Sequence, residues 1–180
     1  MNNEQTKETI AAALKDLCLT TPFDKISVTS LLSASHVGRT TFYYHFEDKY
    51  ALVNWIFDTE TTARKSAETE VMPRDIMETL YESRVFYTNI FNSSAAFNLH
   101  NKIRESCEGI HEARLREYLG KKRMDESDAY VLLHFFTNAV TYTIITWAQN
   151  GFPTNLDDFN DGFTTLHLDC LEFAVGLYAK

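Results

Sequence analysis

Residues 26–46 read ISVTSLLSASHVGRTTFYYHF, and this stretch decides how the N-terminal part of the chain folds. The pattern predicts one short helix over about residues 28–35 and a second over about residues 39–46. Between them lies the turn Ser35-His36-Val37-Gly38. Two short helices joined by about four residues form the skeleton of a helix-turn-helix. The stretch therefore predicts a helix-turn-helix near the N-terminus.

The second of these helices has two different faces. At about 100° per residue, Phe42 and Phe46 fall about 40° apart and define the buried side. The opposite side and its flanks carry hydroxyl, imidazole and aromatic groups: Thr40, Thr41, Tyr43, Tyr44 and His45. Such groups can contact thymine methyls, base edges and phosphates. Arg39 points toward the buried side by angle, but its long stem can reach a guanine edge or a phosphate.

The charge of residues 26–46 fits the same interpretation. These residues include no Asp or Glu, although 25 of the 180 residues of the chain are acidic. A carboxylate facing DNA phosphates would be repelled, so an acid-free surface suits a DNA-facing element. An ordinary packing element could expose the same Tyr and Thr side chains. The pattern alone leaves DNA binding and plain packing about equally open.

The rest of the chain also has the spacing of helices. The expected helices cover about residues 4–19, 28–35, 39–46, 48–70, 74–91, 95–119 (as one or two helices), 126–149 and 156–178. Asp48 or Glu47 opens the long helix expected over residues 48–70. Gly120 ends the helix expected over residues 95–119. We predict an all-α fold of about nine helices. It divides into a helix-turn-helix head, residues 1–50, and a helical bundle for ligand binding and dimerisation, residues 51–180.

Composition limits the classes of protein that fit. The chain has 44% hydrophobic residues and a net charge of −8, which excludes a disordered or collagen-like chain. The acidic total argues against coating nucleic acid by bulk charge but allows a local DNA-reading surface. Cys18, Cys107 and Cys170 are far apart with no CxxC pair, which predicts reduced thiols. No signal peptide or membrane span is expected, so we predict a cytoplasmic protein.

The run TFYYHF at residues 41–46, followed by Asp48-Lys49 and Leu52, resembles the recognition-helix signature of the TetR family of transcription regulators. The similarity covers about residues 7–57 and is only architectural beyond residue 60. With Trp55-Ile56-Phe57 following, the pattern is most similar to the subgroup that includes activators of dihydroxyacetone kinase operons.

This resemblance implies a set of DNA-binding residues: Thr29, Arg39, Thr40, Thr41, Tyr43, Tyr44, His45 and Lys49. It also implies a homodimer, formed by the last two helices, that reads a palindromic double-stranded DNA operator. Two positions depart from the family pattern. His36 stands where Gly is common in the turn, and a left-handed conformation costs more for His. Gly38 replaces the usual capping Ser or Asn.

The helix expected over residues 126–149 is apolar nearly all round, which suggests burial on most sides. One arrangement that achieves this places the helix between its own core and a second copy of the chain. Its polar stripe, His134, Asn138 and Thr141, has the spacing of a single helix face. This stripe predicts a binding face for a small-molecule effector. The alternative is that the three residues are ordinary polar residues of the core or the interface.

Other chemistry finds little support in the sequence. The motifs of common hydrolases, nucleotide-binding enzymes and zinc proteases do not occur, so we predict no enzyme, no catalytic residues and no cofactor. Cys107 and His111 have a spacing that could ligate a metal, but with no third ligand we expect a solvated helix face and no metal site.

The sequence thus predicts a DNA-binding transcriptional regulator modulated by a small-molecule effector. A rival hypothesis is a co-regulator of the same fold that acts through a second regulatory protein, with weak or no direct DNA binding. Its motivation is the charge of residues 1–50, which hold 5 Lys and Arg against 6 Asp and Glu, a net of −1. The salt dependence of DNA binding separates the two hypotheses.

Overall fold

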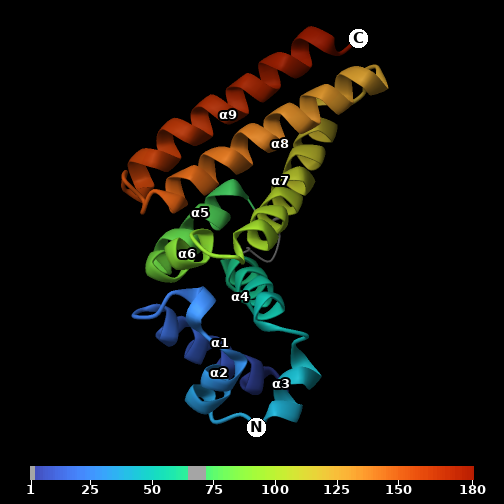
Figure 1. Cartoon of the computed structure of the whole chain (residues 1–180). Coiled ribbons are helices and arrows are strands. Elements are labelled where there is room, and N and C mark those ends of the chain that lie inside the picture. Colours follow the sequence, from blue (N-terminus) through green and yellow to red (C-terminus); the bar gives the residue numbers. More distant parts are fainter. Residues whose placement is uncertain (1–2, 65–71) are drawn as a thin grey trace.

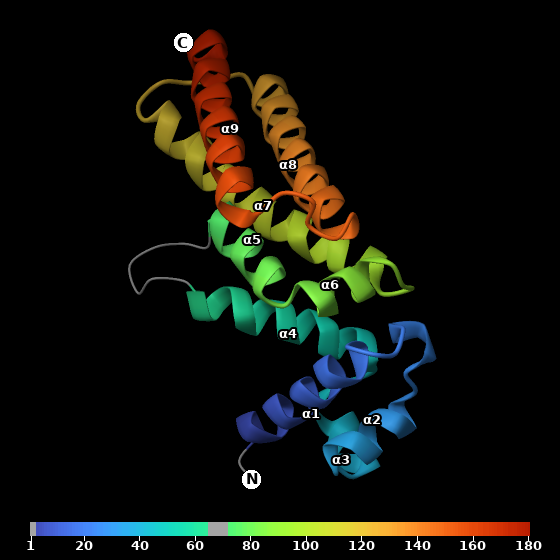
Figure 2. The same cartoon turned by 90° about the vertical axis from the view of Figure 1, so that its left-hand side faces the viewer.

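The computed structural model of the chain describes residues 3–64 and 72–180, apart from the side chains of residues 164 and 165. Within these residues it contains nine α-helices, one 3-10 helix and no β-strand. Figures 1 and 2 show helices α1 to α3 at one end of the molecule and α8 and α9 at the other, with α4 leading from the first group to the bundle. The predicted all-α class is confirmed.

The N-terminal head is built from four elements: α1 (Asn3–Cys18), the 3-10 helix η1 (Phe23–Lys25), α2 (Val28–Ser35) and α3 (Arg39–His45). Ser27 begins α2 because its Oγ accepts a hydrogen bond from the backbone N–H of Ser30 at 3.0 Å, which satisfies a donor at the helix start. Ile10, Leu14 and Phe42 are completely buried and form the centre of the head. The helix-turn-helix thus lies where the sequence predicts it.

The turn between α2 and α3 shows both departures from the family pattern. His36 adopts the left-handed conformation, with φ 54° and ψ 28°. Gly38 is the N-cap of α3 and supplies no side-chain hydrogen bond. Both features raise the free energy of the helix-turn-helix, because a side chain at positive φ is strained and an uncapped helix start leaves backbone donors to solvent.

Replacing His36 with Gly should stabilise the protein by about 1 kcal/mol, because Gly adopts a left-handed conformation without steric cost. Urea-induced unfolding measures the change. Ala34→Gly is the matched control, since Ala34 lies exposed within α2. Glycine inside a helix should lower stability by about 1 kcal/mol. A loss of stability in His36→Gly would contradict the strain assigned to the turn.

Helix α4 (Lys49–Arg64) begins where the sequence suggests. Asp48 is the residue that opens it, since its Oδ1 accepts hydrogen bonds from the backbone N–H groups of Tyr50 and Ala51, each at 2.8 Å. The predicted continuation of this helix to about residue 70 falls on residues that lie outside the described part of the chain.

The region expected as one helix over 74–91 is two helices, α5 (Pro73–Glu82) and α6 (Arg84–Phe91). Ser83 between them leaves helical geometry, with φ −104° and ψ 34°. The change of direction lets α5 pack against α4 and α9 while α6 packs against α1 and α8. The single-helix prediction was wrong because each half has a normal helical pattern and the break depends on distant partners.

Helix α7 (Ala96–Leu119) is a single helix that ends at Gly120, whose φ is 52°. Helices α8 (Glu126–Gln149) and α9 (Leu156–Tyr178) run side by side (Figures 1 and 2). Trp147 of α8 is stacked between Tyr81 and Phe159, with ring centroids 5.7 and 4.3 Å away. This stack fixes the end of α8 against α5 and α9.

One continuous apolar core extends from the head into the bundle, from Ile10 through Phe57 and Tyr87 to Ala148. The division into residues 1–50 and 51–180 therefore remains a prediction about function. Within residues 3–64 and 72–180, α8 is the one helix long and apolar enough to cross a membrane. Half of its most apolar window is buried inside the protein, where it packs against α6, α7 and α9, as a core helix does.

Candidate nucleic-acid interface

Helix α3 presents a polar and aromatic face to solvent. Phe42 is completely buried and Phe46 is 4% exposed, whereas Tyr44 is 77% exposed. Thr40 and Thr41 are also exposed, Tyr43 is about half exposed, and His45 lies at the edge of the buried side. The predicted division of this helix into two faces is therefore found in the structure.

The two buried phenyl rings anchor the helix. The centroid of Phe42 lies 5.9 Å from that of Phe46, and Phe46 in turn packs edge-on against Trp55 of α4 at 5.8 Å. Because α3 has only seven residues, its own hydrogen bonds hold it weakly, and most of its stability comes from this packing. The rings thus fix which side of α3 faces outward.

Arg39 and Thr29 are exposed and lie together, although they are ten positions apart and belong to different helices. Nη2 of Arg39 donates a hydrogen bond to Oγ1 of Thr29 at 3.3 Å. Helical spacing alone places Arg39 toward the buried side of α3. The contact with Thr29 instead directs the guanidinium outward, beside the start of α3. The fixed guanidinium leaves further N–H donors available to an acceptor outside the protein.

Lys49 is placed differently from the other predicted DNA-binding residues. Its ammonium donates to the backbone carbonyls of Phe23 and Ile26, both at 2.8 Å, and lies 4.2 Å from the centroid of the Phe23 ring. These contacts join the start of α4 to η1. Lys49 therefore stabilises the head, and two N–H donors of its ammonium group are bonded within the protein.

Three carboxylates flank residues 26–46 in the sequence; Asp24 and Asp48 accept hydrogen bonds, whereas Glu47 is exposed. Asp48 caps α4, and Asp24 accepts from the backbone N–H and the hydroxyl of Ser94. The hydrogen bonds from Ser94 lower the pKa of Asp24. Residues 26–46 contain no acid, and Arg39 is the one Lys or Arg residue of α3.

Contacts from the bundle hold the head in place, and the sequence gives no local signal for them. Asn89 of α6 bonds the chain between α1 and η1, and Ser94 bonds both Asp24 and the hydroxyl of Tyr50. Lys15 of α1 bonds Ser83 and Glu60. These partners are 44 to 71 positions apart in the sequence.

At the other end of the molecule, α8 and α9 expose a continuous apolar stripe. We call it the outer seam; its residues, each between 62% and 72% exposed, are Val131, Phe135, Tyr142, Leu166, Phe173 and Leu177. On each helix these positions are three, four or seven apart, or multiples of such steps, so they share one face. An exposed apolar face of this extent is typical of a surface that another molecule covers.

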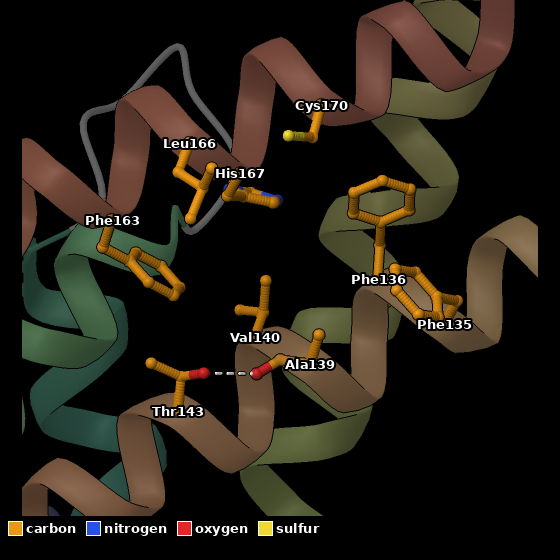
Figure 3. A pocket seen from close by; sticks show the side chains of 9 residues that line it. All are labelled: Phe135, Phe136, Ala139, Val140, Thr143, Phe163, Leu166, His167 and Cys170. Carbon is orange, nitrogen blue, oxygen red and sulfur yellow. Dashed lines mark hydrogen bonds between the residues drawn. The ribbon is translucent and has the colours of Figure 1, made fainter.

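A groove of about 270 Å³ lies between α8 and α9 within this face (Figure 3). The residues that line it are mainly apolar: Phe135, Phe136, Ala139, Val140, Thr143, Phe163, Leu166, His167 and Cys170. The groove is therefore suited to apolar side chains or an apolar ligand.

The three residues predicted to bind an effector do not line this groove. His134 is half-buried, with its Nδ1 3.9 Å from a carboxylate oxygen of Glu108 on α7. Thr141 is buried, and its hydroxyl lies within hydrogen-bonding reach of the Cys107 thiol. Asn138 is exposed and lies between Phe135 and Tyr142 on the outer seam. The shared face is thus divided between α7 and solvent.

Cys107 and His111 are buried, so the prediction of a solvated helix face was wrong. Nδ1 of His111 lies 2.6 Å from the carbonyl oxygen of Cys107 and must carry the proton, because a carbonyl can only accept. In the neutral pair, Nε2–H of His167 on α9 therefore donates to Nε2 of His111, at 2.8 Å. No cluster of three or more metal-ligating side chains occurs among residues 3–64 and 72–180.

The structure thus defines a helix-turn-helix head joined to an all-helical bundle. A family model described as "Transcriptional regulator C-terminal region", one of the TetR C-terminal families, matches residues 68–167, which is more than half of the chain. The chain belongs to the TetR family of transcriptional regulators. It is a regulator and not an enzyme, in agreement with the sequence prediction.

Two further comparisons, one of sequences and one of structures, found similarity to an operon activator. The chain is 28% identical over 91 residues to the HTH-type dhaKLM operon transcriptional activator DhaS of Lactococcus lactis subsp. lactis (strain IL1403). That match covers 48% of this chain and spans 49% of the relative. The solved structure of the dihydroxyacetone kinase operon activator DhaS has the same fold, with a TM-score of 0.73 at 18% identity, over 97% of this chain and 98% of that one.

Proposed function

We propose that this regulator binds a palindromic DNA operator as a homodimer, with the outer face of α3 in the major groove. The observation that carries the proposal is the exposed, acid-free face of α3, which Phe42 and Phe46 anchor from the inside. A short helix of this kind enters the major groove in helix-turn-helix proteins. Figure 2 is consistent with this, because α3 lies at the end of the molecule that is remote from the C-terminus.

The proposed contacts divide into two kinds. Arg39, Tyr44 and the methyl groups of Thr40 and Thr41 are assigned to base edges, since these four side chains are exposed to solvent. The remaining groups, Thr29, Tyr43 and His45, are assigned to phosphates or base edges at the border of the groove. Lys49 is assigned chiefly to holding α4 on η1, with one N–H left for a phosphate.

The outer seam supports a dimer. A second copy of the chain would cover its apolar residues and the groove beside His167. A two-fold axis through α8 and α9 would place the two heads on the same side and present their α3 helices to successive major-groove turns, about 34–36 Å apart. The dimer would thus read two half-sites.

A small-molecule effector in the bundle remains part of the proposal. Among the predicted residues, Thr141 offers a buried hydroxyl beside the Cys107 thiol. A ligand that favours one spacing of the heads would shift the population of DNA-competent dimers. The similarity to an operon activator supports activation of an operon as the form of regulation, and a regulator of this family is expected to act in the cytoplasm.

Binding to DNA tests the proposal. An operator is first selected from random duplex DNA, and the affinity is then measured at increasing salt. Neutralised phosphates release counterions, so direct binding gives a steep negative slope of log affinity against log salt. No binding at low salt would instead favour the co-regulator hypothesis, which the net charge of −1 over residues 1–50 supports.

We expect Arg39→Ala and Tyr44→Ala each to lower affinity for this operator roughly tenfold to a hundredfold, or about 1–3 kcal/mol for a base contact. Tyr44→Phe removes the hydroxyl and keeps the ring, so its comparison with Tyr44→Ala separates their contributions to the affinity. Arg116→Ala is the control, because Arg116 is an exposed arginine on α7, far along the chain from the head. Unchanged affinity in both alanine variants would remove α3 from the interface.

A further inference from the structure

One side chain of the bundle, Asn89 of α6, makes hydrogen bonds to the segment of chain between α1 and η1. Its Nδ2 group donates to the backbone carbonyls of Cys18 and Thr21, at 2.9 and 2.8 Å. Its Oδ1 accepts from the backbone N–H of Phe23 at 2.9 Å. One amide thus makes hydrogen bonds to three residues of the head within the span 18–23.

The amide has one possible orientation. If its oxygen and nitrogen were exchanged, an oxygen would face two carbonyl oxygens and an NH₂ group would face an N–H donor. The groups it satisfies are also ones that helices leave without partners: the carbonyl of Cys18 at the end of α1, and the N–H of Phe23 at the start of η1. Asn89 therefore fixes both the position and the angle of this connection.

Helix α6 also makes hydrogen bonds to the end of α8. Oγ1 of Thr88 donates to the carbonyl of Ala148 at 3.3 Å, and Nε2 of Gln149 donates to the carbonyl of Phe91 at 3.4 Å. Figures 1 and 2 show α6 between the head and α8. Neighbouring residues of one short helix thus contact the head and a helix that carries the outer seam.

We propose that Asn89 is a positioning residue for DNA recognition: it sets the angle of the head on the bundle and so the spacing of the two α3 helices in the dimer. The inference rests on the proposed function for its consequence in DNA binding. The contact through Ser94, Asp24 and Tyr50 holds the head at a second point, near η1 and the start of α4. Lys15 of α1 bonds Ser83, at the start of α6, at a third point. Asn89 is distinct from both, because it bonds the backbone of the connection between α1 and η1.

A distance measurement within one protomer tests the inference without DNA. Spin labels are placed at Glu8→Cys on α1 and Glu105→Cys on α7, both exposed positions, in a Cys170→Ser background. Cys18 and Cys107 are buried, so a labelling ratio of two per chain confirms the attachment sites. Labelled chains are diluted with unlabelled protein so that distances between protomers do not contribute.

We expect one narrow distance distribution with Asn89 present and a broad or multiple distribution with Asn89→Ala. Asn89→Asp should broaden it as well, since a carboxylate oxygen would then face the carbonyls of Cys18 and Thr21. Asn92→Ala is the matched control, because the side chain of Asn92 lies at the end of α6 and, among the described residues, bonds Thr88 and Gln149 and no residue of the head. An unchanged distribution in Asn89→Ala, even with a lower melting temperature, would overturn the inference.

Operator spacing gives the second readout. With about one or two base pairs inserted between the half-sites, the protein with Asn89 should lose at least roughly tenfold in affinity, because its heads are fixed. Asn89→Ala should bind the original operator more weakly but lose less than roughly threefold on insertion. Equal sensitivity of the two proteins would overturn the inference. If neither binds any DNA, the proposed function fails, and the distance measurement alone decides the role of Asn89.

Discussion

Phe173→Glu is expected to convert the proposed dimer into monomers. Phe173 is 69% exposed on the outer seam, and in a two-fold dimer the substitution occurs twice. Each copy loses the burial of an aromatic ring and gains a carboxylate that must leave water. The two copies together should raise the free energy of association by at least about 4 kcal/mol, roughly a thousandfold in dissociation constant. Sedimentation velocity over a range of concentrations measures the change.

Phe97→Glu is the matched control for this experiment. Phe97 is 71% exposed near the start of α7, outside the outer seam, so its replacement should leave the dimer intact. Phe173→Glu should also lower the affinity for the operator, because it weakens dimerisation and a monomer binds one half-site only. A Phe173→Glu protein that remains a dimer would show that the outer seam is not the dimer interface.

Acidification is expected to destabilise the protein through the buried imidazoles of His111 and His167. Burial, the neighbouring His111 and the charge of Arg114 lower the pKa of His167 to about 4. Burial also lowers the pKa of His111. In the unfolded chain a histidine has a pKa of about 6.5, so the unfolded state binds more protons between the two values. The stabilisation is fully present above about pH 7 and is lost as the pH falls.

His167 alone should then contribute a loss of about 2 kcal/mol in the free energy of unfolding between about pH 7.5 and pH 5. Urea-induced unfolding at each pH measures it. His167→Gln should remove this part of the pH dependence, because an amide NH₂ can still donate to Nε2 of His111 but does not titrate.

Thr137→Val is the control for the histidine pair. Its hydroxyl is buried 3.4 Å from Nδ1 of His111, so the substitution changes the packing but leaves both imidazoles in place. The variant should be less stable at every pH, with the slope of the wild-type protein. If His167→Gln keeps the full pH dependence, other groups are responsible for it.

Local patterns were sufficient to predict the helix-turn-helix. The position of Phe42 and Phe46 on one side of α3 follows from helical spacing alone, and Asp48 and Gly120 mark helix ends by their own chemistry. The left-handed conformation of His36 was likewise expected from the family pattern. In each case the residues that decide the structure are within a few positions of one another.

Features that depend on distant partners could not be read in the same way. Lys49 bonds carbonyls 23 and 26 positions away, which the motif at residues 41–52 does not reveal. Cys107 and His111 look like part of a solvated face until α9 brings His167, 56 positions further on, to within hydrogen-bond distance. Asn89 belongs to no motif, and the groups it satisfies are backbone atoms, which leave no trace in side-chain patterns.

The two tryptophans of the chain report on different parts of the molecule. Trp55 packs edge-on against Phe46 beneath α3, and Trp147 is stacked between Tyr81 and Phe159 at the end of α8. Intrinsic fluorescence of a protein with a single remaining indole therefore follows either the reading head or the bundle without an attached dye. Stopped-flow mixing with an operator or a metabolite would then time the response of each end separately.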